Sequence, residues 1–154
     1  MATKRIPDGY GTVTPYLIVK DAARALDFYK SALDAVELYR MPDPSGRVAH
    51  AEMRVGNSQV MLADEVPDMG AVSPQTLGGA GVSFLVYVDD VDSAYRKAVA
   101  AGAKEKRPVQ DQFYGDRAGT IQDPFGHQWT LATHVEDVPP DEIQRRFEEM
   151  AKQR

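Results

Sequence analysis

The stretch Thr120–His134, TIQDPFGHQWTLATH, places two apolar runs on either side of a tight turn. The turn is Asp123-Pro124-Phe125-Gly126, and its Asp, Pro and Gly are residue types that favour chain reversal. The flanking runs RAGTIQD and HQWTLAT are therefore predicted to be paired strands. His127 follows the turn directly, so it belongs either to a functional site or to the scaffold.

The same order of elements occurs twice in the chain. The first half predicts a strand at about Thr12–Lys20, a helix AARALDFYKSAL capped by Asp21, and the strands AVELYRM, RVAHAEMRV and QVMLAD. The second half predicts a strand VSFLVYV, a helix VDSAYRKAVAAGA capped by Asp89 or Asp90, and three extended segments. The order β-α-β-β-β therefore repeats at an offset of about 69 residues, which indicates a duplication.

The length of 154 residues predicts a single domain. The repeated order of elements predicts an α+β fold built from two paired βαβββ modules. We expect module one at about 10–65, a linker at about 66–81, module two at about 82–135 and a C-terminal helix at about 139–152, capped by Asp141. The linker is rich in Pro and Gly, and it either connects the modules or covers a cleft as a flap; connection is the simpler interpretation.

Composition narrows the possible partners. The net charge is −5, so the chain has no basic excess with which to bind nucleic acid. There is no cysteine, which excludes thiol catalysis and fits a reducing compartment. We find no apolar signal region and no run long enough for a membrane helix, so we expect a cytoplasmic protein without membrane contact.

The motifs YLIVKDAARALDFY and DPFGHQW, in matching places of the two halves, resemble the vicinal oxygen chelate superfamily of glyoxalases, bleomycin-resistance proteins and dioxygenases, and within it the PhnB-like branch. The resemblance implies that the two modules form an open, cup-shaped cleft. Metal-using members hold a divalent ion there with one ligand from the first and one from the last strand of each module. It also implies that small members pair as homodimers.

These ligand positions can be read in the present chain. By the family pattern they fall on Thr14, Met61, Ser83 and Thr130, none of which is a carboxylate or an imidazole. Neutral hydroxyls and a thioether are poor ligands for Mg²⁺, Mn²⁺, Zn²⁺ or Fe²⁺. We therefore predict that the family's metal site is absent and that the protein needs no cofactor.

The strand alternation predicts which side chains line the cleft. They are mostly apolar or neutral polar groups, which suit a small organic ligand with ring character. The ligand-binding candidates are Thr14, Tyr16, Met61, Ser83, Tyr87, Gln128, Thr130 and Arg117. His127 and Trp129 fall on the opposite face of their strand, so both are interpreted as scaffold.

Four residues are candidates for catalysis. His50 and Glu52 are two apart on one strand and form either an acid/base pair or a surface ion pair. Tyr114 and Arg117 lie in the loop QDQFYGD and at the strand that follows it. Arg117 either clamps an anionic group of a ligand or pairs with Asp116 or Asp123.

Two classes of function remain open from the sequence. The first is a metal-independent small-molecule binding protein, and the second is a lyase, isomerase or glyoxalase-like enzyme that uses an atypical metal site or His50 and Glu52 as acid and base. The PhnB-like branch is sometimes labelled as methyltransferases, but the chain has no Gly-rich nucleotide loop after its first strand, which argues against methyl transfer.

Overall fold

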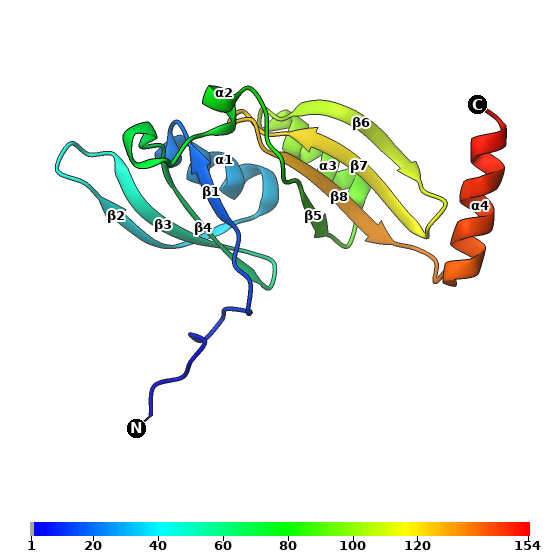
Figure 1. Ribbon diagram of the computed structural model, residues 1–154, viewed down its shortest axis with the longest axis horizontal. Helices are drawn as coiled ribbons and strands as arrows, with labels where there is room; N and C mark the ends of the chain where they lie inside the picture. The colour runs from blue at the N-terminus through cyan, green and yellow to red at the C-terminus, as the bar shows by residue number, and fades with distance from the viewer. Residues whose placement is uncertain (1) are drawn as a thin grey trace.

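The computed structural model describes residues 2–154 and contains two β-sheets of four strands each, side by side along the long axis of the molecule (Figure 1). The first module consists of β1 (Tyr16–Val19), α1 (Ala22–Leu33), β2 (Val36–Pro42), β3 (Val48–Val55) and β4 (Ser58–Asp64). The second consists of β5 (Phe84–Tyr87), α3 (Val91–Ala100), β6 (Lys104–Asp111), β7 (Asp116–Gln122) and β8 (Gln128–His134). The predicted α+β fold with two βαβββ modules is confirmed.

The two sheets repeat each other in strand order and in register. Their orders are β1-β4-β3-β2 and β5-β8-β7-β6, with the first and last strands of each module parallel. Tyr16 pairs with Met61 in the first sheet, and Leu85 pairs with Thr130 in the second. Both positions shift by the offset read from the sequence, so the structure supports the interpretation as a duplication.

The helices α1 and α3 each begin after an aspartate, and each is fixed to the last strand of its own module. Asp21 and Asp90 cap α1 and α3 by accepting hydrogen bonds from main-chain N–H groups in the first turn. The buried Asp64 carboxylate accepts from the N–H of Ala22, and the Thr133 hydroxyl accepts from the N–H of Val91. Asp64 and Thr133 occupy equivalent positions of the two modules, and both accept a hydrogen bond from the start of a helix although they are different residues.

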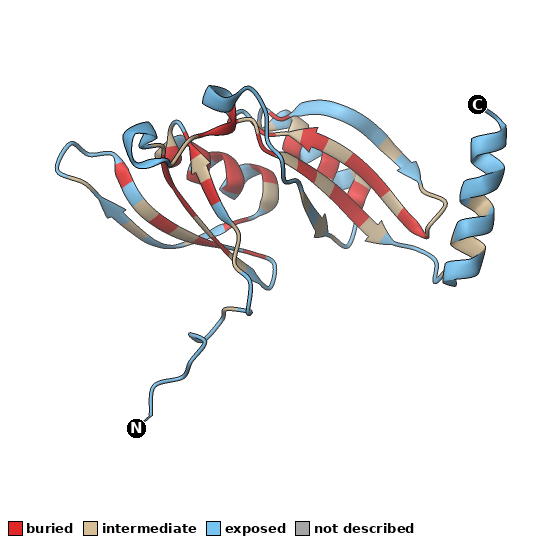
Figure 2. Ribbon diagram, viewed as in Figure 1, coloured by how far each residue is buried: buried red, intermediate tan, exposed pale blue. Residues whose placement is uncertain are grey.

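The core lies between the helices and one face of each sheet, as the alternation of buried and partly exposed residues along the strands shows (Figure 2). On β1, Leu17 and Val19 are buried against α1, whereas Tyr16 and Ile18 point to the other side. We call the side of each sheet not covered by its helix the open face.

One buried carboxylate, that of Asp123 in the turn between β7 and β8, links the two modules. One of its oxygens accepts hydrogen bonds from the N–H groups of Phe125 and His127, and the other accepts from the Tyr29 hydroxyl and the Trp129 indole N–H. Tyr29 belongs to α1, so this single side chain ties the second module to the first. Burial and the neighbouring Asp123 raise the pKa of Tyr29, which keeps its hydroxyl a donor.

His127 closes a free edge of the first sheet. β1 is an edge strand. The carbonyl oxygen of Pro15 accepts from the N–H of Met61 on β4, and that of Val19 accepts from Glu65 just after β4, which leaves the carbonyl of Ile18 directed away from the sheet. The Nε2 atom of His127 lies 3.2 Å from that oxygen. Both His127 and Trp129 are buried, which fits their interpretation as scaffold.

The segment between the modules is anchored at several points. It contains a 3₁₀ turn η1 (Pro67–Met69) and a short helix α2 (Pro74–Leu77). Glu65 accepts a hydrogen bond from the N–H of buried Ser73, and the Gln75 side chain donates to the carbonyl of Pro124. These contacts fit a connector fixed to the DPFG turn.

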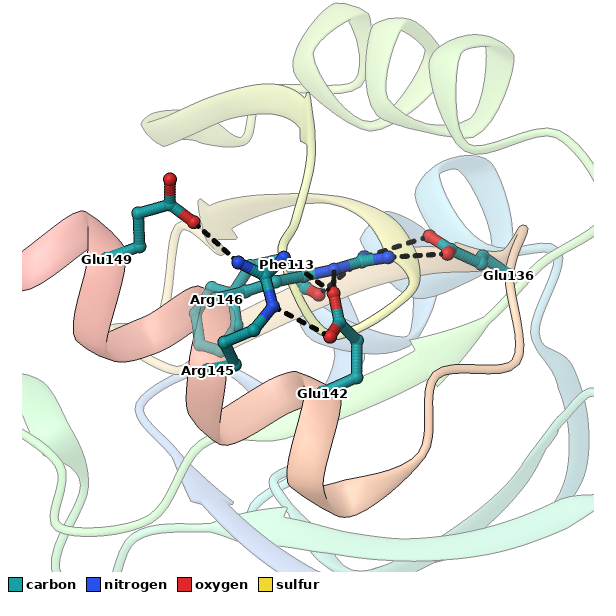
Figure 3. Close-up of polar contacts among 6 residues, drawn as sticks. All are labelled: Phe113, Glu136, Glu142, Arg145, Arg146 and Glu149. Carbon is teal, nitrogen blue, oxygen red and sulfur yellow. Dashed lines mark hydrogen bonds and ion pairs between the residues drawn. The ribbon is translucent and has the colours of Figure 1, made fainter.

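The C-terminal helix α4 (Pro140–Lys152) lies beyond the outer end of the second module and has no buried residue (Figure 2). Arg146 attaches it to the body by donating to both carboxylate oxygens of Glu136 and to the carbonyl of Phe113 (Figure 3). The rings of Phe113 and Phe147 pack with centroids 5.8 Å apart. No helix within residues 2–154 combines the length and apolar character needed to cross a bilayer.

Two boundaries differ from the sequence-based expectation. β1 starts at Tyr16 rather than near Thr12, and Pro15, which has no N–H, directly precedes it. The N-cap of α4 is Pro139, and Asp141 lies in the first turn of the helix instead of capping it. A carboxylate in the first turn still complements the helix dipole.

Asp123→Asn is expected to lower the free energy of unfolding by about 2–4 kcal/mol, since an amide keeps one acceptor oxygen but faces the Tyr29 and Trp129 donors with an N–H₂ group. Urea unfolding followed by Trp129 fluorescence measures the change. The matched control is Asp89→Asn at an exposed position, where we expect almost no effect. Equal stabilities of the two variants would contradict the central role of Asp123.

Candidate functional site

The four family ligand positions lie on or just before the first and last strands of the two sheets. Met61 is on β4 and Thr130 on β8, each on the open face, while Thr14 and Ser83 precede β1 and β5. The Thr130 hydroxyl forms a hydrogen bond of 2.9 Å with that of Thr120 on the neighbouring strand β7. One of these hydroxyls donates to the other.

The donor set of these positions does not fit the divalent metal that other members of the family hold. Two hydroxyls of Thr, one of Ser and one thioether offer neither negative charge nor imidazole nitrogen. Among residues 2–154 we also find no cluster of three or more His, Asp and Glu side chains arranged to hold an ion.

The open face of the first sheet carries a chain of hydrogen-bonded polar groups. The Nε2 atom of His50 lies 2.9 Å from one carboxylate oxygen of Glu52, and its Nδ1 atom lies 2.8 Å from the Tyr16 hydroxyl. The Tyr10 hydroxyl, from the segment before β1, donates to the other oxygen of Glu52. The pairing of His50 with Glu52 is as expected, whereas Tyr10 carried no recognisable signal in the sequence.

A hollow of about 460 Å³ adjoins this chain at Tyr16. Its apolar part is formed by Ile18 and Ala63 from the open face and by Val66 and Met69 from the segment between the modules. Asp43 and Arg47 stand at its polar side. The linking segment thus forms one wall of a hollow on the first module in addition to its connecting role.

The open face of the second sheet carries a different set of groups. The Tyr87 hydroxyl donates to one oxygen of the buried Asp116 carboxylate at 2.9 Å. The other Asp116 oxygen lies 2.8 Å from Nδ1 of His134, whose Nε2 atom lies 2.7 Å from Asp137. Hydrogen bonds to these two carboxylates raise the pKa of His134.

Among the remaining predicted site residues, Arg117 lies on the opposite face of its sheet. Its guanidinium donates to both carboxylate oxygens of Asp92 on α3, at 2.8 and 2.9 Å, and to Asp111. It pairs with neither Asp116 nor Asp123, so that alternative was wrong. Its guanidinium is occupied on the helix side of the sheet, so Arg117 does not contribute to the open face.

Tyr114 and Gln128 belong to the second module. Tyr114 is half-buried in the loop before β7 and packs edge-on against Phe113, with ring centroids 5.3 Å apart. Burial and the nearby Asp116 raise the pKa of Tyr114, so it is a proton donor rather than a base near neutral pH. Gln128 lines a separate hollow of about 410 Å³ together with Ser83.

Comparison with known proteins agrees with this fold. A family model of the glyoxalase/bleomycin resistance protein/dioxygenase superfamily matches residues 10–131, and the chain belongs to that superfamily. The uncharacterized protein Rv0887c of Mycobacterium tuberculosis is 46% identical over 135 residues, covering 86% of this chain and 79% of that protein.

Two solved structures show the same fold. The Arabidopsis thaliana At5g48480 product has a TM-score of 0.64 and 30% identity, over 80% of this chain and 98% of that one. The PhnB protein of Bacillus cereus has a TM-score of 0.62 and 19% identity, over 80% of this chain and 99% of that one. Structural neighbours therefore include PhnB-like proteins, as the sequence motifs suggested.

Because the pKa of His134 is higher in the folded chain than in the unfolded one, His134 contributes stability that is full below its ordinary pKa of about 6.5 and is lost as the pH rises through the folded pKa. We expect the stability advantage of the wild type over His134→Gln to shrink as the pH rises above about 6.5. Urea midpoints at several pH values measure it. Asp137→Asn should reduce the pH dependence in part, and a difference independent of pH would contradict the assignment.

Proposed function

We propose that this protein binds a small organic ligand without a metal, on the open faces of its two sheets. The observation that carries the proposal is the presence of neutral side chains at all four family ligand positions. A hollow of about 460 Å³ on the first open face, lined mainly by apolar groups, supports it. Such a hollow with a few polar groups is typical of sites for ring-containing molecules. Thr14, Tyr16, Met61, Ser83, Tyr87, Gln128 and Thr130 are the proposed contacts.

The proposal includes a second copy of the chain. Large apolar side chains are exposed on the edge strand β2, namely Val36, Leu38, Tyr39 and Met41, at 41–49% each. Leu85 and Tyr87 are similarly exposed on the other open face. Apolar groups gathered on an edge strand favour cover by another protein surface, and a twofold homodimer is the simplest such cover.

A second candidate function is acid/base catalysis at the first open face. The observation that favours it is the continuous chain Tyr16–His50–Glu52, in which a carboxylate orients an imidazole that contacts a hydroxyl. That arrangement can move a proton to or from a bound molecule. Turnover of any bound compound, lost in a folded His50→Ala variant, distinguishes an enzyme from a binding protein.

The metal-independence of binding is tested by thermal unfolding with aromatic compounds, in the presence of chelator or of Mg²⁺, Mn²⁺ or Zn²⁺. A ligand at about 100 times its Kd stabilises the folded state by about 2.7 kcal/mol, which raises the Tm by several degrees in a chain of this size. We expect the same shift with chelator as with metal. Met61→Glu should abolish the shift, whereas Met150→Glu on α4 should leave it intact. A shift that requires a metal would sink the proposal.

The dimer is tested by sedimentation equilibrium. Leu38→Glu places a charge among the exposed apolar residues of β2 and should move the wild-type dimer toward monomer by at least about tenfold in dissociation constant. Leu77→Glu, at an exposed position in the linking segment, is the matched control. A wild-type protein that stays monomeric at all concentrations contradicts this part of the proposal.

A further inference from the structure

The hydrogen bonds around Glu52 determine which nitrogen of His50 carries the proton. An ionised carboxylate only accepts hydrogen bonds. One Glu52 oxygen accepts from the Tyr10 hydroxyl, and the other lies 2.9 Å from Nε2 of His50. The Nε2 atom must therefore carry a proton, and when the ring is neutral this proton is its only one.

The position of this proton sets the direction of the next hydrogen bond. In a neutral ring with Nε2–H, the Nδ1 atom has a free lone pair and accepts. It lies 2.8 Å from the Tyr16 oxygen, so the Tyr16 hydroxyl donates its only hydrogen to His50. Burial raises the pKa of Tyr16, which keeps that hydrogen on the phenol.

The Tyr16 oxygen is then left with lone pairs and no hydrogen to offer a ligand. Tyr16 is 47% exposed and borders both the hollow of about 460 Å³ and a second one of about 350 Å³ under α2. The surrounding walls are largely apolar, with Ile18, Met69 and Leu77 among them. A ligand group without a donor hydrogen cannot form a hydrogen bond with this oxygen, and the lost hydrogen bond weakens its binding.

We propose that Tyr16 is the specificity-determining residue of the first open face and that the chain Glu52–His50 holds its hydroxyl as a hydrogen-bond acceptor. The site therefore selects ring compounds that bear an N–H or O–H donor over equally sized compounds that bear only acceptors. The inference rests on the small-molecule site proposed above. His50 and Glu52 act as positioning residues and do not touch the ligand.

The first test reads the proton position without any ligand. Long-range ¹H–¹⁵N NMR of the histidine rings at about pH 8.5 distinguishes the two tautomers, and variants at the three histidines of the chain assign the signals. We expect His50 to carry its proton on Nε2, and Glu52→Gln to reduce that preference. A proton on Nδ1, in the other tautomer or in the cation, overturns the inference whatever the protein binds.

The second test compares two uncharged probes of similar size, aniline as donor and acetophenone as acceptor, by NMR titration of the wild-type protein at the same pH. We expect aniline to be preferred, and Tyr16→Phe to reduce the preference about fivefold, the worth of one hydrogen bond. Tyr95→Phe removes a tyrosine hydroxyl that donates to the Arg107 carbonyl in the second module, and it should leave the preference unchanged.

The outcomes separate the two proposals. Equal affinity for both probes, or a preference that survives in Tyr16→Phe, overturns the specificity inference while the binding function stands. Binding of neither probe and of no other aromatic compound overturns the proposed function and with it the ligand selectivity, even where His50 is protonated on Nε2 as expected.

Discussion

The buried carboxylate of Asp123 is the interaction on which the arrangement of the two modules depends. It accepts four hydrogen bonds, two from the main chain of its own turn and two from the side chains of Tyr29 and Trp129. A buried carboxylate is costly unless its lone pairs are satisfied, so the turn, the indole and the first helix must all be in place together. The contact of His127 with the edge of β1 adds a second link between the modules.

The duplicated fold shows which positions are free to change. Asp64 and Thr133 both hold the start of a helix, and the strand register around them is preserved. The polar side chains of the two open faces differ more, because these faces do not pack against a helix. One has the imidazole–carboxylate pair of His50 and Glu52, and the other has the carboxylate of Asp116 held by Tyr87 and His134.

The chemistry of the open faces follows from neutral side chains at the positions where relatives place metal ligands. Neutral side chains at these positions can discriminate by shape and by the direction of a few hydrogen bonds. In the proposed site, one such direction is set at the Glu52 carboxylate, which both Tyr10 and His50 approach. A binding protein and an enzyme would share this arrangement and differ only in whether the proton moves.

The sequence by itself determined the two modules and the strand faces, because turn residues, helix caps and alternation are local signals. The four neutral ligand positions came from the resemblance to the superfamily and not from a local signal. Strand alternation also placed His127 and Trp129 on the helix side of β8. Only the tertiary structure decided the partners of Arg117, which pairs with Asp92 across a sheet–helix contact, and the roles of Tyr10 and His134. These contacts join residues far apart in the chain, and their directions depend on how two modules and a terminal segment pack, which no local pattern encodes.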